Sequence, residues 1–153
     1  MRKTMIQCVG NVILFTLLGL AFIFPTSEVT KIEMGLSANL TIFPVLLVTY
    51  LIAYPVIYYI ISKKYQWGKR DISELTYTDE REKIIVAEST KTAYKVLVGG
   101  LLIIIAVIGG VNYLSLFTGI ATNLYSISIT LLTLLLNIAM ISYCVKWCLE
   151  YKK

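Results

Sequence analysis

The chain has no histidine among its 153 residues, and its nine acidic and fourteen basic side chains avoid four long apolar stretches. Without histidine, the commonest acid–base group and metal ligand of proteins is missing. The three cysteines form no Cys-x-x-Cys pair, and no motif for a nucleophile or a phosphate loop is present. Because no carboxylate lies in the apolar stretches, proton-coupled transport through a buried acid is also disfavoured. We expect no enzymatic activity, no metal site and no cofactor.

The four charge-free stretches are long enough, or nearly so, to cross a bilayer. They cover residues 9–25, 42–61, 96–117 and 120–145, and a helix needs about 20 residues to span the hydrocarbon layer. The composition agrees, since 58% of the residues are hydrophobic, against about 45–50% in a soluble domain. We predict an all-α polytopic membrane protein with four transmembrane helices in a bundle, forming one membrane domain over 1–153.

The basic residues are concentrated on one side of the predicted membrane. Of the fourteen lysines and arginines, all except Lys31 lie before the first stretch, between the second and third, or after the fourth. The positive-inside rule assigns that side to the cytoplasm. We therefore expect a plasma-membrane protein with both termini cytoplasmic, whose basic side faces anionic headgroups rather than nucleic acid. The first stretch lacks a small-residue cleavage site, so we expect it to remain as a signal anchor.

The two connections on either side of the second stretch differ in character. The outer loop admits a small surface helix around 29–34. The segment 63–92 is the cytoplasmic loop, in which Thr78 suits the N-cap of a helix. No glycine or proline follows until the third stretch, so we predict one helix that begins in the cytoplasm and continues across the membrane. Its charged start is either a solvated face or a partner-docking surface, with the candidates Asp79, Glu80, Arg81 and Glu82.

Aromatic and small residues mark helix faces within the apolar stretches. Tyr50, Tyr54 and Tyr58 recur every four residues and therefore form one ridge on the second stretch. Small residues let helix backbones approach closely in lipid. The third stretch contains several, and its candidates for helix packing are Gly99, Gly100, Ala106, Gly109 and Gly110.

The fourth stretch carries a polar seam, which consists of Ser126, Thr130, Thr133 and Asn137. Spacings of 4, 3 and 4 place these side chains on one helix face. One interpretation is a neutral groove that binds a small ligand or lines a pathway. The other is interhelical hydrogen bonding that holds the helices, or a dimer, together. The sequence favours the second interpretation, because serine, threonine and asparagine commonly join membrane helices.

All three cysteines are expected near the cytoplasmic face. Cys144 and Cys148 share a helix face, and with Cys8 they could form a three-thiolate site or carry lipid modifications. Reduced, packed thiols are the simpler interpretation in the cytoplasm.

With the spans placed, one polar run stands out before the third, and it reads Asp79-Glu80-Arg81-Glu82-Lys83-Ile84-Ile85. The chain resembles uncharacterised small four-helix integral membrane proteins of bacteria and archaea, which often carry an Asp-Glu-Arg-Glu element before the third span. The likeness covers the layout of the whole chain, while its specific motif covers about seven residues. The resemblance implies the same topology, and some such proteins are thought to accompany transcriptional regulators or exporters.

These patterns favour a non-enzymatic accessory protein, namely a regulatory, immunity-type or scaffold subunit. It would contact another membrane protein, or a second copy of itself, through the small residues of the third stretch and the seam of the fourth. The alternative is an oligomeric transporter or channel subunit that uses the seam as neutral ligand contacts. A membrane enzyme is a third class, for which tyrosine or cysteine would have to supply the chemistry.

Overall fold

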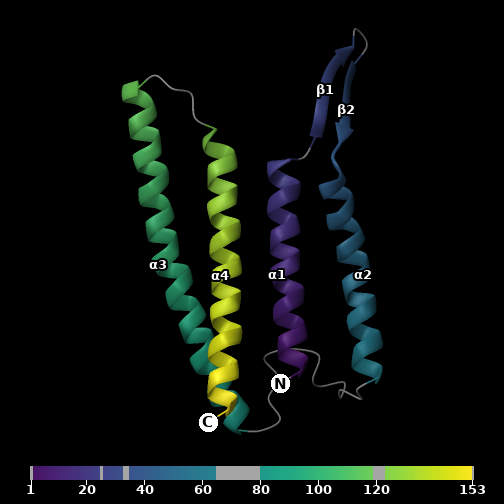
Figure 1. The fold of residues 1–153 in the computed structure, drawn as a ribbon, viewed down its shortest axis with the longest axis vertical. Coiled ribbons are helices and arrows are strands. Elements are labelled where there is room, and N and C mark those ends of the chain that lie inside the picture. The colour runs from purple at the N-terminus through teal and green to yellow at the C-terminus, as the bar shows by residue number, and fades with distance from the viewer. Residues whose placement is uncertain (1, 25, 33–34, 65–79, 119–122, 153) are drawn as a thin grey trace.

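A computed structural model describes residues 2–24, 26–32, 35–64, 80–118 and 123–152 of the chain. Four helices and one hairpin make up these residues (Figure 1). In chain order the elements are α1 Arg2–Ile23, β1 Thr26–Ile32, β2 Gly35–Leu40, α2 Ile42–Lys64, α3 Glu80–Thr118 and α4 Leu124–Lys152.

Each of the four helices is long and apolar enough to cross a membrane, as the charge-free stretches predict. The chain is therefore a multi-pass membrane protein. With 39 residues, α3 extends for about 58 Å at 1.5 Å per residue, well beyond the roughly 30 Å hydrocarbon layer. This length confirms that one helix joins the charged run to the third span, although its expected N-cap, Thr78, lies outside the described residues. In α2, Pro55 lies within the helix, where membrane helices tolerate proline.

The helices lie in a row rather than around a common centre. The extensive contacts between helices join α3 to α4, α4 to α1, and α1 to α2, and Figure 1 shows this order across the molecule. Both termini lie at the same end of the helices (Figure 1). The compact four-helix bundle stays a prediction, whereas the row identifies α1 and α4 as the helices with a neighbour on each side.

The connection between α1 and α2 is a hairpin, and the surface helix expected around 29–34 is wrong for its described part. Strands β1 and β2 pair antiparallel, with Val29 opposite Ala38 and Ile32 opposite Gly35. β-branched residues at 29, 30 and 32 favour an extended backbone over a helix. At the base of the hairpin, the Thr41 hydroxyl donates to the carbonyl of Phe24, which joins the ends of the two helices.

Large apolar side chains cover the outside of the row. No residue of α2 is buried, and Ile52, Leu102, Ile103 and Ile105 each expose about two thirds of their surface. A water-soluble protein rarely exposes such a continuous apolar surface. In a bilayer, however, acyl chains cover it at no hydrophobic cost. The described residues are thus arranged as a protein surrounded by lipid.

Candidate functional site

The two seam residues of α4 nearer the termini, Thr133 and Asn137, face α1. The Asn137 side-chain amide donates to the Thr16 hydroxyl over 3.2 Å. Thr133 lies against Gly19, where a Cβ would overlap the threonine side chain. Two of the four seam residues therefore contact a neighbouring helix of the same chain, as the interhelical interpretation of the seam expects.

The other two seam residues, Ser126 and Thr130, form hydrogen bonds at the start of α4 itself. Asn123 caps α4 by accepting a hydrogen bond from the Ser126 backbone N–H over 3.2 Å. The exposed Thr130 hydroxyl donates to the Ser126 carbonyl one turn earlier, over 2.7 Å. Neither Ser126 nor Thr130 bonds to another helix within the described ranges. The four residues therefore share a face, as predicted, but they do not form one continuous polar groove.

The tyrosine ridge of α2 contacts α1 at a glycine. Tyr50 and Tyr54 stack with ring centroids 5.4 Å apart, and a Cβ on Gly10 would overlap the Tyr54 ring. The Tyr50 hydroxyl donates to the Gly10 carbonyl over 2.8 Å. Because Gly10 has no side chain, the ring and the hydroxyl can reach the helix backbone. The ridge is thus the α1-facing side of α2.

Gly10 and Gly19 are structural positions that the sequence analysis did not single out. Nine residues separate them, so at about 100° per residue they lie on opposite faces of α1. Gly10 packs against Tyr54 of α2, and Gly19 packs against Thr133 of α4. The signal that could have found them is this spacing, which suits a helix with a neighbour on each side.

The small residues of α3 divide into two groups. Gly100 packs against Leu135 of α4, whose side chain occupies the place of the missing Cβ. In contrast, a Cβ added at Gly99, Gly109 or Gly110 would meet no described atom within 4 Å, and Ala106 is exposed. One of the five packing candidates is therefore used within the described chain, and four face outward.

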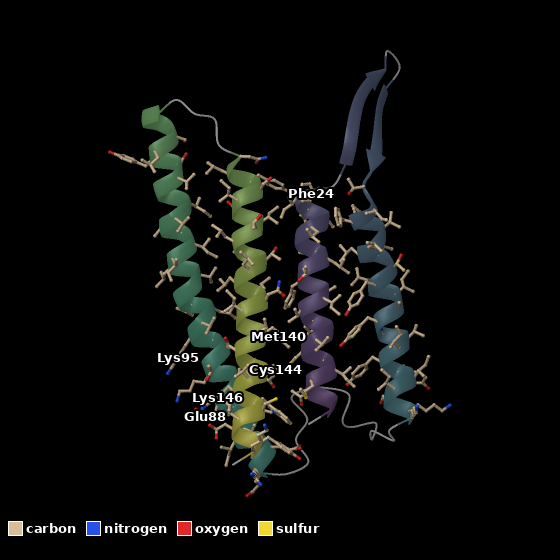
Figure 2. The ribbon with its side chains drawn as sticks, viewed as in Figure 1. Phe24, Glu88, Lys95, Met140, Cys144 and Lys146 are labelled. Atoms are coloured by element: carbon tan, nitrogen blue, oxygen red, sulfur yellow. The ribbon has the colours of Figure 1, made fainter. Side chains whose placement is uncertain are left out.

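The three cysteines lie at the end of the molecule that holds the termini. Cys8 is buried in a cluster with Ile85 and Val86 of α3 and Tyr143 and Trp147 of α4, and Cys144 and Cys148 pack against that cluster. Figure 2 shows Met140 and Cys144 on α4, and both residues line a cavity between α4 and α1. Among the described residues none of the three forms a disulfide, and no cluster of metal-ligating side chains occurs.

The charged start of α3 is only partly described. Asp79 lies outside the described residues, while Glu80 and Arg81 are exposed and Glu82 is half-buried. Further along, Lys91 and Glu88 form a weak ion pair over 3.8 Å. On α4, Lys146 and Glu150 form a closer pair over 2.7 Å, and Figure 2 places Glu88 and Lys146 at the same end of the molecule. At this end of the molecule, charged side chains lie on the surface around the apolar cluster of Cys8 and Trp147. A docking role for Glu80, Arg81 and Glu82 stays a prediction.

No protein-family model, curated protein or solved structure matches this chain. The resemblance to small four-helix membrane proteins therefore stays a prediction, and the geometry of the helices carries the functional argument.

Proposed function

We propose that the chain is a non-enzymatic accessory subunit of a prokaryotic plasma membrane, of the regulatory, immunity or scaffold type. It acts by packing the outward face of α3 against another membrane protein or a second copy of itself. The observation that supports this proposal is the open space beside Gly99, Gly109 and Gly110 of α3, where an added Cβ would meet no described atom within 4 Å.

The position of these residues on the helix strengthens the argument. Gly99, Ala106 and Gly110 follow spacings of 7 and 4, which place them on one face at about 100° per residue. Gly100 and the buried Ile104 lie on a different face, toward α4. Because a glycine in a helix lowers stability by about 0.5–1 kcal/mol relative to alanine, the presence of Gly99 and Gly110 on one exposed side suits a close helix partner.

The charge distribution supports a particular orientation. The ends of α1 and α4 that carry the termini lie with Lys63 and Lys64 of α2 and with the charged start of α3. We assign this end to the cytoplasm by the positive-inside rule, next to anionic headgroups. Thiol labelling of intact cells should then miss Cys8, Cys144 and Cys148, whereas a cysteine introduced at Ser37 of the hairpin should react. Labelling of Cys148 from outside would reverse the orientation.

The transporter alternative has less support. It requires Ser126, Thr130, Thr133 and Asn137 to line a shared path, but Thr133 and Asn137 contact α1. A flux assay in liposomes separates the two functions. Solute or ion movement that Asn137→Leu abolishes without unfolding the protein would favour the transporter over the accessory subunit.

Variants on α3 test the accessory proposal directly. Gly110→Leu should break co-purification with the membrane partner, or self-association, in mild detergent, because leucine fills the space that a partner helix would occupy. Ile105→Phe enlarges an exposed side chain elsewhere on the same helix and should leave the association intact. If both variants, or neither, disrupt the association, the outward face of α3 is not the contact surface.

A further inference from the structure

A cavity of about 180 Å³ lies between α1 and α2, in the half of the helices nearer the termini. Its lining among the described residues is Gln7, Asn11, Tyr54 and Tyr58. The two amides come from α1 and the two phenols from α2, and each pair is four residues apart, so each pair shares one helix face. Its position away from the small-residue face of α3 makes it independent of the proposed partner contact.

One polar atom of this cavity has no partner. The Gln7 side-chain nitrogen donates to the Tyr58 hydroxyl over 2.9 Å, but the carbonyl oxygen Oε1 is buried and accepts no hydrogen bond from any described residue. If the amide is turned over, its oxygen accepts from the Tyr58 hydroxyl and its N–H group is left without a partner instead. A buried polar group without a hydrogen bond is costly in the apolar part of a bilayer. The site therefore suits a ligand that brings a hydroxyl, which can donate to the oxygen or accept from the N–H group.

The lining also indicates the charge of the ligand. The four described lining side chains are neutral, so none of them offers a positive charge to a phosphate or carboxylate. A buried charge without a partner is strongly unfavourable in this environment. Gln7 lies inside the apolar part of α1, Thr4–Ile23, which begins before the predicted stretch 9–25. Both observations favour an uncharged group.

The same helix faces become apolar toward the middle of the membrane. On α1, Leu14 and Leu18 follow Gln7 and Asn11 at helical spacing. On α2, leucines at 47 and 51 precede the two tyrosines at the same spacing. Polar groups near the helix ends and leucines near the centre match a lipid whose head lies at the cavity and whose chains run inward.

We propose that the α1–α2 cavity binds the head of a neutral glycerolipid with a free hydroxyl, of the diacylglycerol class. The lipid hydroxyl donates to Gln7 Oε1, and the ester carbonyls accept from the Asn11 amide. The acyl chains lie along the leucines of α1 and α2. The site thereby distinguishes lipids by a hydroxyl donor rather than by a charge.

Native mass spectrometry of the full chain in mild detergent tests the site with three probes. We expect one dioleoylglycerol to be retained per chain. Trioleoylglycerol, which lacks the hydroxyl, should be retained about fivefold less, the effect of one neutral hydrogen bond. Dioleoyl phosphatidylcholine, which carries charges and has no hydroxyl, should bind no better than trioleoylglycerol. Equal retention of all three lipids, stronger retention of the phospholipid, or no retained lipid would overturn the proposal, the last because water would then fill the cavity.

Variants locate the bound lipid. Gln7→Leu and Asn11→Leu should each lower dioleoylglycerol retention about fivefold. Asn112→Leu removes an exposed amide from α3 and should change nothing. Gln7→Leu also removes the bond to Tyr58, so Asn11→Leu and the lipid series decide the outcome if that variant does not fold. Retention that survives Asn11→Leu would overturn the assignment.

Discussion

Two helices of this protein carry several glycines, and they use them differently. On α1, Gly10 and Gly19 lie on opposite faces, and at each a side chain of a neighbouring helix occupies the place of the missing Cβ. Among the described glycines of α3, only Gly100 has a neighbouring side chain in the place of its missing Cβ, while a Cβ added at Gly99, Gly109 or Gly110 would meet no described atom within 4 Å. Thus α1 is a central helix held on both sides, and α3 is an edge helix held on one side.

This difference shows what holds helices together in lipid. Apolar surface alone gives little preference for a neighbouring helix, because acyl chains are equally apolar. At α1 the contacts are instead specific, with the Tyr50 hydroxyl on the Gly10 carbonyl and the Asn137 amide on Thr16. The outward face of α3 carries small residues but packs against no helix within the described chain. The proposed function rests on this difference.

The largest loss of stability should follow removal of the side chain that holds α3 at its edge position. Trp147 is 3% exposed and packs in the cluster that joins α3, α4 and Cys8. Trp147→Ala should lower the free energy of unfolding by about 3–5 kcal/mol through the cavity it leaves. Denaturant titration in micelles, followed by circular dichroism, measures this. Leu149→Ala, at an exposed position of the same helix, is the control, and a similar loss there would show that the cluster is not what holds α3.

A matched pair of glycine variants tests the comparison itself. Gly10→Ala places a methyl group in the Tyr54 ring and should cost about 1–3 kcal/mol of unfolding free energy. Gly109→Ala adds the same methyl group in open space and should be neutral, or stabilising by up to about 1 kcal/mol. The same titration measures both variants. Equal effects would remove the distinction between the closed faces of α1 and the open face of α3.

A smaller effect is expected from the hydrogen bond between α4 and α1. A double-mutant cycle with Asn137→Leu and Thr16→Val should give a coupling energy of about 0.6 kcal/mol, typical for polar pairs between membrane helices. The matched cycle pairs Thr130→Val with Thr16→Val and should show no coupling, because Thr130 bonds within its own helix. Coupling of equal size in both cycles would mean that the seam does not act through the Asn137–Thr16 bond.

The smallest effect belongs to the ion pair near the end of α4. Lys146 and Glu150 lie 2.7 Å apart with partly exposed side chains, so Glu150→Gln should cost about 0.3–0.5 kcal/mol. Because salt screens such pairs, the cost should shrink in 0.5 M salt, where the assay is repeated. A loss that does not depend on salt would indicate packing rather than charge.

The four helices could be predicted from the sequence because charge is excluded from lipid. This constraint placed the start of α2 at Ile42 and joined the charged run to the third span within α3. The hairpin could not be predicted in the same way, because a short polar loop carries no such constraint and therefore admits a surface helix as well.

The neighbours of each helix were harder to predict. Apolar faces look alike in the sequence whether lipid or another helix covers them. The pattern of α3 therefore predicted five packing residues, of which one is packed among the described residues. The seam was placed on one face correctly, but its contacts with Thr16 and Gly19 depend on which helix lies next to α4. The order of the helices is a property of the tertiary structure. In the sequence, only the spacing of Gly10 and Gly19 on α1 indicates that this helix has a neighbour on each side.

In our proposal, the outward face of α3 meets a protein while its remaining exposed surface meets lipid. A photo-crosslinking amino acid at Ala106, compared with one at Ile105, tests this in native membranes. We expect a crosslink from position 106 to a membrane polypeptide, either another protein or a second copy of this chain, and crosslinks from position 105 to lipid. Crosslinks from both positions to lipid alone would contradict it.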